Sequence, residues 1–308
     1  MKTISVVLPC LNEAQNLPLL IPQIIKSIPK KYNYEIILVN DGSSDNTTTM
    51  IELLARKNKN IKGIIFYKRF GHQPALKAGI ENTTGSAVIT MDSDFQHPPS
   101  LIPKLIKLWE KGYDLVSAQK TEDHSSGKLM RFGRKIGYFI WQKVSGGLLI
   151  PGVSDFRIMS REISLYLKEN PEKEIFIRGL TQLVAKNPTS IKYKVGKRKF
   201  GKTSYTLSLA TNLFINGFIS FSTFPLRSAW VLGIIFFLII GIYLIFDIVV
   251  TLLKGKRLIE GYITIVLLSV VLNGILLFYL GIIGEYLRVI FKEAKNRPPH
   301  LIVKKINC

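Results

Sequence analysis

The sequence predicts an α/β domain with a mostly parallel sheet, followed by a hairpin of two transmembrane helices. The first observation is that residues 1–120 alternate between short apolar runs and segments with helical spacing, which is typical of a parallel sheet with helices on both faces. The second is the pair of long apolar stretches at 229–253 and 261–286, whose only charged residues are Asp247 and Glu285. Each stretch exceeds the ~20 residues that a helix needs to cross a bilayer.

Each element of the α/β domain follows from its own run of residues. The run TISVVLP (3–9) is apolar and ends at a proline, and the next segment has the apolar spacing of an amphipathic helix. The same alternation then repeats along the chain. Strands are therefore expected at 3–9, 35–41, 61–68, 85–94 and 113–119, and helices at 14–28, 44–58, 73–83 and 101–112. Ser44 and Asp45 are the expected N-caps of the second helix.

The connection between the two apolar stretches, residues 254–260, is short, so both ends of the hairpin are expected on one side of the membrane. Basic residues are more numerous at those ends than in the connection. The positive-inside rule therefore places residues 1–227 and the basic tail 289–308 in the cytoplasm, with 228–288 in the membrane. Two buried helices of a soluble bundle are the alternative interpretation, which the length and the lack of polar periodicity disfavour.

Two further segments have the composition of helices that lie in the membrane interface. Residues 128–149 mix Lys and Arg with aromatic residues and leucine, whereas residues 206–224 carry few charges and lead into the first span. For the first segment, an amphipathic helix packed on the sheet is the alternative. Arg131, Arg134 and Lys135 lie in it, and we expect them to attract anionic lipids near the membrane surface; a solvated basic face is the alternative interpretation of each.

The chain carries 42 Lys and Arg against 21 Asp and Glu, a formal charge of +21. Such an excess indicates an anionic partner: nucleic acid, a membrane surface or a phosphate-bearing substrate. No nucleic-acid recognition motif occurs in the sequence, and nucleic-acid binding would not explain the hairpin, so nucleic acid is not an expected partner. The two cysteines, Cys10 and Cys308, form no metal-binding or disulfide spacing, which fits a reducing compartment.

Polar residues cluster at the carboxyl ends of three predicted strands, at 12–13, 41–45 and 92–96. Ligands of open α/β sheets bind outside the carboxyl ends of the strands, so these clusters are expected to meet in one site. In the second cluster, Asp41 can accept hydrogen bonds from a nucleobase or ribose, and Gly42 allows a close backbone approach; an ordinary turn is the alternative. Neither a Walker loop nor a GxGxxG motif is present, which argues against those nucleotide sites.

The third cluster, MDSDFQ (91–96), indicates a divalent metal site. In an extended segment, residues two apart project from the same face, so Asp92 and Asp94 are expected to reach one ion. Carboxylate oxygens and the Gln96 carbonyl are hard ligands suited to Mg²⁺ or Mn²⁺. A D-x-D pair alone is common in loops, and we expect His97, before two prolines, to be structural.

Together these segments resemble a known family. The motifs LPCLNEAQNL, VNDGSSDNT, MDSDFQHPPS and GVSDFRIMSRE occur in the order and rough spacing of inverting family-2 glycosyltransferases with the GT-A fold. The resemblance extends from Thr3 to the NRPPHLIV tail and is strongest to the polyprenyl-phosphate branch. That branch includes dolichyl-phosphate mannose synthase and bacterial two-span undecaprenyl-phosphate glucosyltransferases.

The resemblance implies roles for individual residues. It places nucleotide-sugar binding on Pro9, Asn12, Glu13, Asp41, Asp92, Arg198, Lys202 and Ser204. It places the metal on Asp92, Asp94 and Gln96, and catalysis on Asp155 and Asp94. It places the lipid phosphate on Lys120, Arg131, Arg134 and Arg157; at Lys120 relatives often carry arginine, whose bidentate fork lysine lacks.

Asp155 matches the residue usually described as the family's general base. The acceptor implied by the resemblance is a lipid monophosphate, whose second pKa of about 6 leaves it largely ionised at neutral pH. We therefore expect Asp155 to orient Arg157 or the metal shell more than to remove a proton. A surface ion pair between Asp155 and Arg157 is the alternative without function.

The resemblance implies inverting transfer of a hexose from a nucleotide diphosphate-sugar to polyprenyl phosphate in the bacterial plasma membrane. UDP-glucose is the favoured donor and undecaprenyl phosphate the favoured acceptor, with a GDP-mannose-dependent mannose synthase as the alternative. Relatives also suggest a homotetramer. A non-catalytic membrane scaffold and a flippase component are hypotheses from other classes. The intact acidic cluster argues against the scaffold, and two spans are too few for a flippase unless chains assemble.

Overall fold

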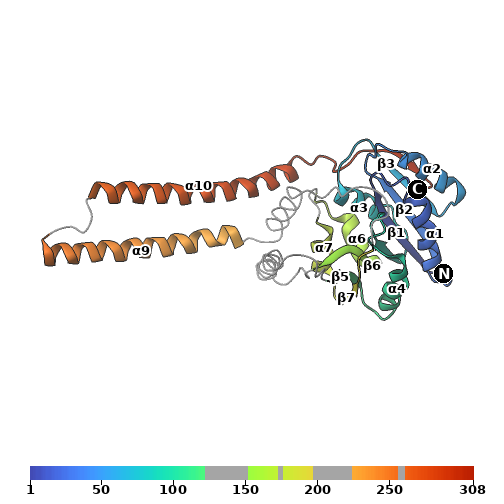
Figure 1. Ribbon diagram of the computed structural model, residues 1–308, viewed down its shortest axis with the longest axis horizontal. Coiled ribbons are helices and arrows are strands. Elements are labelled where there is room, and N and C mark those ends of the chain that lie inside the picture. The colour runs from blue at the N-terminus through green and yellow to red at the C-terminus, as the bar shows by residue number, and fades with distance from the viewer. Residues whose placement is uncertain (122–151, 173–175, 197–223, 256–260) are drawn as a thin grey trace. The chain divides into compact units, whose positions relative to one another are not determined.

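The computed structural model describes residues 1–121, 152–172, 176–196, 224–255 and 261–308 (Figure 1). The chain divides into two units: Met1–Ala210 with Asn296–Cys308, and Thr211–Lys295. The interfacial helices predicted at 128–149 and 206–224 lie outside the described residues except for Phe224, which begins a long helix of the second unit.

The first unit alternates strands and helices as predicted. Its strands are β1 (Thr3–Cys10), β2 (Asn33–Asn40), β3 (Ile61–Phe66), β4 (Ala87–Thr90), β5 (Leu115–Lys120), β6 (Val153–Ser160), β7 (Pro188–Tyr193) and β8 (Ile302–Ile306). Its helices are α1 (Leu17–Ser27), α2 (Thr47–Lys57), α3 (His72–Glu81), the 3₁₀ turn η1 (Pro99–Leu101), α4 (Ile102–Glu110), α6 (Arg161–Glu169) and α7 (Ile177–Val184). The predicted caps of α2 are wrong: Asn46 precedes the helix, and Asp45 instead accepts the N–H of Thr47 at 3.0 Å.

The eight strands that the structure describes form one sheet in the order β7-β5-β6-β4-β1-β2-β3-β8. The pairs β1–β2, β1–β4, β2–β3 and β5–β7 are parallel, which confirms the predicted mostly parallel sheet. Strand β6 runs antiparallel to both neighbours, β4 and β5, and β8 runs antiparallel to β3. The sequence did not predict β6 or β8, and each of them proves to matter for the site.

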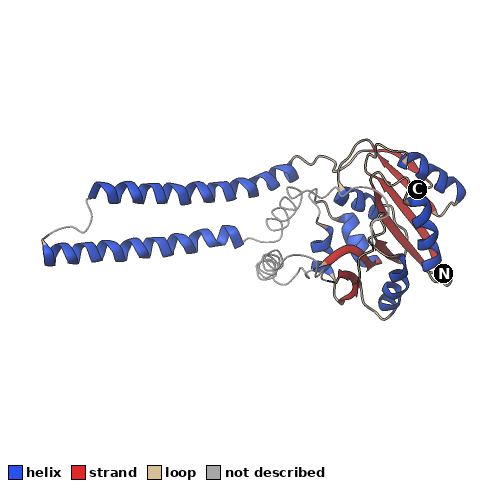
Figure 2. Cartoon of the chain, viewed as in Figure 1, coloured by secondary structure: helices blue, strands red, loops and turns tan. Residues whose placement is uncertain are grey.

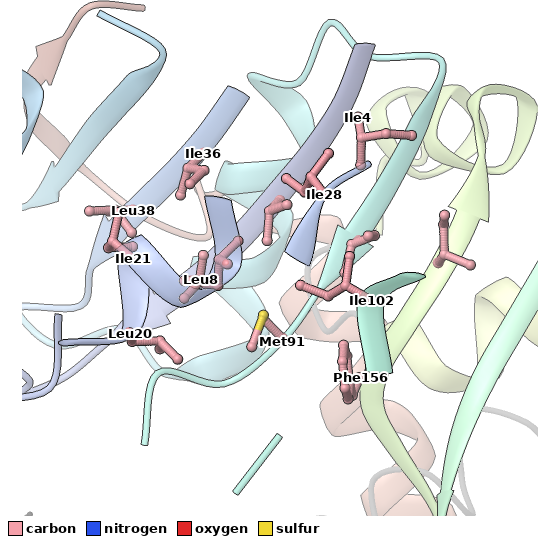
Figure 3. Packing of buried hydrophobic residues seen from close by; sticks show 14 of the residues in the cluster. Ile4, Leu8, Leu20, Ile21, Ile28, Ile36, Leu38, Met91, Ile102 and Phe156 are labelled. Carbon is pink, nitrogen blue, oxygen red and sulfur yellow. The ribbon is translucent and has the colours of Figure 1, made fainter. Parts of the chain in front are cut away.

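Helices cover both faces of the sheet, as the alternating pattern requires (Figure 2). On one face, side chains of α1, α2 and α4 pack with β1 and β2 in a cluster that includes Leu8, Leu20 and Ile36, and Phe156 of β6 belongs to the same cluster (Figure 3). On the other face, α3 lies against Val7 and Val39. Neighbouring residues of one strand thus point to opposite faces, and both faces are buried under helices.

The C-terminal tail, predicted only as a basic segment, returns to the sheet as β8. Its register with β3 pairs Ile306 with Gly63, and the Tyr67 N–H donates to Leu301 O at 3.0 Å. Lys304 of β8 forms an ion pair of 2.8 Å with Glu52 of α2. The chain therefore leaves the first unit before the two long helices and ends within the same sheet that contains its first strand.

The second unit contains the helices α9 (Phe224–Lys254) and α10 (Gly261–Ala294). They cover the predicted spans at 229–253 and 261–286, and α10 continues for two further turns. By length and composition, the segments Leu226–Leu253 and Leu268–Ala294 are apolar enough to cross a membrane, and in neither is the apolar stretch buried within the chain.

Candidate active site

The carboxyl ends of β1, β2 and β4 lie at one edge of the sheet because these strands are parallel and adjacent. Strand β6 is antiparallel to β4, with Arg157 opposite Thr90, so its first residues lie at that same edge. The Thr90 hydroxyl donates to the backbone carbonyl of Asp155 at 2.5 Å. Asp155, the predicted catalytic residue, therefore joins the strand-end clusters through an antiparallel strand.

Asp155 is held by a bidentate interaction with Arg178 of α7. The Arg178 Nε donates to Oδ1 at 2.9 Å and its Nη2 donates to Oδ2 at 2.6 Å. Arg157 Nη2 lies 3.7 Å from Oδ1, and His72 Nδ1 lies 3.9 Å from Oδ2. Burial alone would raise the pKa of Asp155, but Arg178, His72 and Arg157 hold it well below its usual range. The carboxylate is therefore ionised, and both its oxygens face cationic or imidazole groups.

Arg157 lies in the interior, with 1% of its side chain exposed. Its Nη1 donates to the Thr181 hydroxyl at 2.5 Å and its Nη2 to Ser154 O at 2.8 Å, while Nε has no hydrogen-bond partner among the described residues. Burial lowers the pKa of Arg157 to about 10, against the opposing charge of Asp155. The alternative of a surface ion pair is wrong, and this burial does not favour the predicted contact of Arg157 with a lipid phosphate.

The D-x-D segment differs from the prediction because β4 ends at Thr90 and the chain then turns, with Phe95 at a φ of 68°. Asp92 and Asp94 therefore lie in a turn and not in an extended segment. Asp92, with 32% of its side chain exposed, interacts with His72 Nε2 at 2.9 Å. Asp94 is buried, and its Oδ1 accepts the N–H of Gln96 at 3.0 Å.

His97 has the structural role that the sequence predicted. Its Nδ1 accepts the backbone N–H of Asp92 at 2.9 Å, and its ring stacks on Phe156 at a centroid distance of 5.1 Å. Burial lowers the pKa of His97, although the neighbouring Asp92 opposes that shift. The buried His97 imidazole therefore supports the turn that carries the acidic pair.

The predicted nucleotide-binding residues at the carboxyl end of β1 and just beyond it connect the loops that follow β1, β2 and β4. The carbonyl of Pro9 accepts the Ser93 hydroxyl at 2.9 Å, which ties the end of β1 to the D-x-D turn. Asn12 has a φ of 58° and its Oδ1 accepts the N–H of Ser44 at 2.9 Å. Glu13 accepts a hydrogen bond from the Asn16 amide. These contacts hold three strand ends in one rim.

Asp41 accepts hydrogen bonds from the backbone of the β3–α3 loop: from Phe70 N at 2.7 Å and from Gly71 N at 3.0 Å. Burial raises the pKa of Asp41 despite these bonds. The close approach at Gly42, which has a φ of 67°, is to Arg69 N, where an added Cβ would lie at 2.4 Å. In this structure Asp41 and Gly42 therefore contact the β3–α3 loop of the protein itself.

The same loop is joined to the C-terminal tail. The imidazole of His300 stacks on Phe66 with ring centroids 4.9 Å apart, and Phe66 makes an edge contact of 5.7 Å with Phe70. Phe70 is the residue whose N–H reaches Asp41. The segment that follows the second long helix thus supports the predicted base-binding aspartate.

Gly196, which precedes the predicted nucleotide-sugar-binding residues Arg198, Lys202 and Ser204, lies beside the D-x-D turn, since its N–H donates to Gln96 O at 3.1 Å. Those three predicted residues lie outside the described residues, as do Arg131 and Arg134. Lys120 is exposed at the end of β5.

Comparison with known proteins decides the family. The model of glycosyl transferase family 2 matches residues 5–165. The chain is a family-2 glycosyltransferase. It is 34% identical to the bactoprenol glucosyl transferase of Shigella phage SfX, over 97% of this chain and 98% of that protein. It is 33% identical to a prophage bactoprenol glucosyl transferase homolog of Escherichia coli K12 (98% and 99% covered) and 36% identical to the putative glycosyltransferase CsbB of Bacillus subtilis 168 (99% and 92% covered).

Family membership and the observed sheet confirm the predicted GT-A class of this glycosyltransferase. Sequence reasoning missed two residues of its site, His72 and Arg178. His72 follows the carboxyl end of β3, so the strand-end rule could have identified it. Arg178 offered no signal, because it lies on a short helix 23 residues beyond Asp155 and no pattern links the two.

Asp92 of the D-x-D turn offers a ligand suited to a hard divalent cation, but no group of three or more His, Cys, Asp or Glu residues among those described is arranged to hold a metal ion. Asp92 is partly exposed, and although its burial would raise the pKa, His97 and His72 hold the pKa of Asp92 well below its usual range. Its carboxylate is therefore ionised at the rim. Carboxylate oxygens are the ligands that Mg²⁺ and Mn²⁺ prefer. A bound cation would replace the compensating charge that His72 supplies to Asp92 in this structure.

Proposed function

We propose that this family-2 glycosyltransferase transfers a hexose, with glucose favoured, from a UDP-sugar to polyprenyl phosphate with inversion. The observation that carries the proposal is the similarity to a bactoprenol glucosyl transferase over 97% of the chain, which includes both long helices. A match confined to residues 5–165 would support sugar transfer alone. The full-length match also supports a lipid-phosphate acceptor.

The site geometry suits a direct displacement between a nucleotide diphosphate and an acceptor phosphate. Asp92 at the end of β4 and Asp155 at the start of β6 are bridged by His72, whose two ring nitrogens lie 2.9 and 3.9 Å from the two carboxylates. The donor half, around Asp92, and the acceptor half, around Asp155, are therefore one imidazole apart. Mg²⁺ or Mn²⁺ held by Asp92, Asp94 and Gln96 would neutralise charge that develops on the departing diphosphate.

Asp155 is poorly suited to accept a proton. Its oxygens accept two hydrogen bonds from Arg178, and the same cations hold its pKa low. A polyprenyl phosphate would arrive largely ionised, since the second pKa of a phosphate monoester is about 6. We infer that Asp155 positions guanidinium groups at the acceptor half and that the acceptor phosphate oxygen attacks without prior deprotonation by the protein.

Chain connectivity supports a membrane topology that we propose. Because strands β1 and β8 belong to one sheet, we expect the residues before α9 and after α10 to lie on the same side of a membrane that the two helices cross. Two membrane crossings, one by α9 and one by α10, would return the chain to the side on which it started. We propose that the first unit, which contains the sheet and is called the sheet unit below, faces the cytoplasm of the bacterial plasma membrane, because the basic residues that flank the hairpin outnumber those in its connection.

A donor screen on the full chain in detergent tests the function. Radiolabelled UDP-glucose and GDP-mannose are each supplied with undecaprenyl phosphate in Mg²⁺, Mn²⁺ or EDTA, and the lipid-phase label is measured. We expect transfer from UDP-glucose that requires both the cation and the lipid, with a β-linked product from the α-linked donor. Transfer only from GDP-mannose would replace the proposed donor, and no metal-dependent transfer to the lipid from either donor would refute the proposal.

A further inference from the structure

Two arginines contact Asp155 in the acceptor half of the site. Arg157 Nη2 lies 3.7 Å from Oδ1, and Arg178 Nη2 lies 2.6 Å from Oδ2. The two arginines differ in access: 1% of the Arg157 side chain is exposed, against 33% of the Arg178 side chain. An anion that approaches from solvent can therefore reach Arg178 but not Arg157.

We propose that Arg178 binds the phosphate of the lipid acceptor and that Asp155 presents its guanidinium for that purpose. This inference rests on the proposed function and names a residue of its acceptor site. It moves the phosphate contact from Arg157, which the sequence suggested, to an arginine of α7. Arg157 then has a supporting role, since it lies behind Asp155 and is anchored by Thr181 and Ser154.

The geometry of Arg178 suits a phosphate monoester. A guanidinium presents five N–H donors in a planar fork that matches phosphate oxygens. Asp155 engages Nε and one N–H of Nη2, which fixes the plane of the fork. Because Asp155 is buried and held by the β4–β6 pairing, that plane is set by the sheet. The phosphate would therefore meet a guanidinium that is already oriented.

The position of Arg178 also places the acceptor next to the donor. Arg178 contacts Asp155, and His72 lies between Asp155 and Asp92 of the proposed metal site. His72 is itself 42% exposed at its side chain, so the space beside both groups opens to solvent. In this chain of contacts, only the side chains of Asp155 and His72 lie between Arg178 and Asp92 of the proposed metal site.

A purely positioning role for Arg178 predicts different kinetics. If Arg178 only orients Asp155, its substitution lowers kcat and leaves the KM for the lipid unchanged. If Arg178 binds phosphate, the KM for polyprenyl phosphate rises while the KM for the nucleotide-sugar stays the same. Loss of a charge-assisted hydrogen bond costs about 1.5–3 kcal/mol, which corresponds to an increase of about 10- to 100-fold in the acceptor KM.

The variants Arg178→Gln and Arg178→Lys test this in the full chain in detergent. Arg56→Gln and Arg56→Lys are matched controls, because Arg56 is an exposed arginine of α2 far along the sheet from β6. We expect a higher acceptor KM for Arg178→Gln, a smaller increase for Arg178→Lys, which keeps the charge without the fork, and no change for the controls. An unchanged acceptor KM in both Arg178 variants overturns the inference.

A binding measurement separates this inference from the proposed function. Farnesyl phosphate, a short prenyl phosphate, is titrated into the full chain without nucleotide, with farnesol as the uncharged comparison. Weaker binding of farnesyl phosphate by both Arg178 variants, with equal binding of farnesol, supports the inference even if the donor screen fails. Equal binding of farnesyl phosphate by the wild type and Arg178→Gln overturns it even if the transferase activity is confirmed.

Discussion

Replacement of Asp155 by Asn should destabilise the sheet unit as well as impair catalysis. The Asp155 and Arg157 side chains are 4% and 1% exposed, so the carboxylate is the nearest compensating charge for a guanidinium that has no access to water. Water can solvate the guanidinium of Arg178, because 33% of its side chain is exposed, but it cannot reach the guanidinium of Arg157. The substitution therefore leaves one buried and uncompensated cation.

The magnitude follows from this burial. Removal of one partner of a buried ion pair typically costs about 3–5 kcal/mol. We expect a value near the lower limit, because Arg157 keeps its hydrogen bonds to Thr181 and Ser154 and lies 3.7 Å from the lost oxygen. For a unit of the size of residues 1–210 with 296–308, about 1 kcal/mol corresponds to about 2–4 °C in Tm. Asp155→Asn should therefore lower Tm by about 6–12 °C.

Thermal unfolding of the full chain in detergent, followed by circular dichroism, measures this shift. Glu52→Gln is the matched control: it neutralises one carboxylate of an exposed pair with Lys304, which is expected to contribute less than about 1 kcal/mol. The double variant Asp155→Asn, Arg157→Met removes the stranded cation and should recover part of the lost Tm. A Tm for Asp155→Asn within the range of the Glu52→Gln control would refute the reasoning from buried charge.

Three further predictions concern activity. His300→Ala should raise the KM for the nucleotide-sugar about 2- to 10-fold, because the stack on Phe66 is lost; Val303→Ala, at an exposed position of the same C-terminal tail, is the control, and equal KM values for the two variants would contradict the coupling. The pKa of Asp155 is depressed, so its carboxylate stays ionised above the unfolded pKa of about 3.9 and loses its charge only when the pH falls well below that value. The decline of kcat/KM at acid pH should therefore come from protonation of the acceptor phosphate near pH ~6, and the variant Asp155→Asn should show the same decline. Loss of this decline in Asp155→Asn would show that Asp155 acts as the general base. Asp94→Ala should abolish the stimulation of transfer by Mn²⁺, and full metal-stimulated activity in that variant would remove Asp94 from the metal site.

The sequence alone predicted those features that depend on local pattern. The apolar alternation identified the strands and helices of the parallel sheet and the two long apolar helices, because hydrophobic periodicity is a property of each segment by itself. It also predicted that the loops after β1, β2 and β4 would meet, since the carboxyl ends of adjacent parallel strands share one edge. The resemblance to the family came from the combination of the motifs LPCLNEAQNL, VNDGSSDNT, MDSDFQHPPS and GVSDFRIMSRE.

Tertiary structure decided everything that depends on contacts between distant segments. Strand β6 pairs antiparallel with β4, which brings Asp155 to the active edge, and β8 pairs with β3 across more than two hundred residues. Whether Arg157 or Arg178 faces solvent could not be inferred from the sequence, because the burial of a side chain depends on contacts between distant segments. The two arginines differ in side-chain exposure. Arg178 of α7 is 33% exposed, whereas Arg157 of β6 is 1% exposed and lies in the interior beside Asp155.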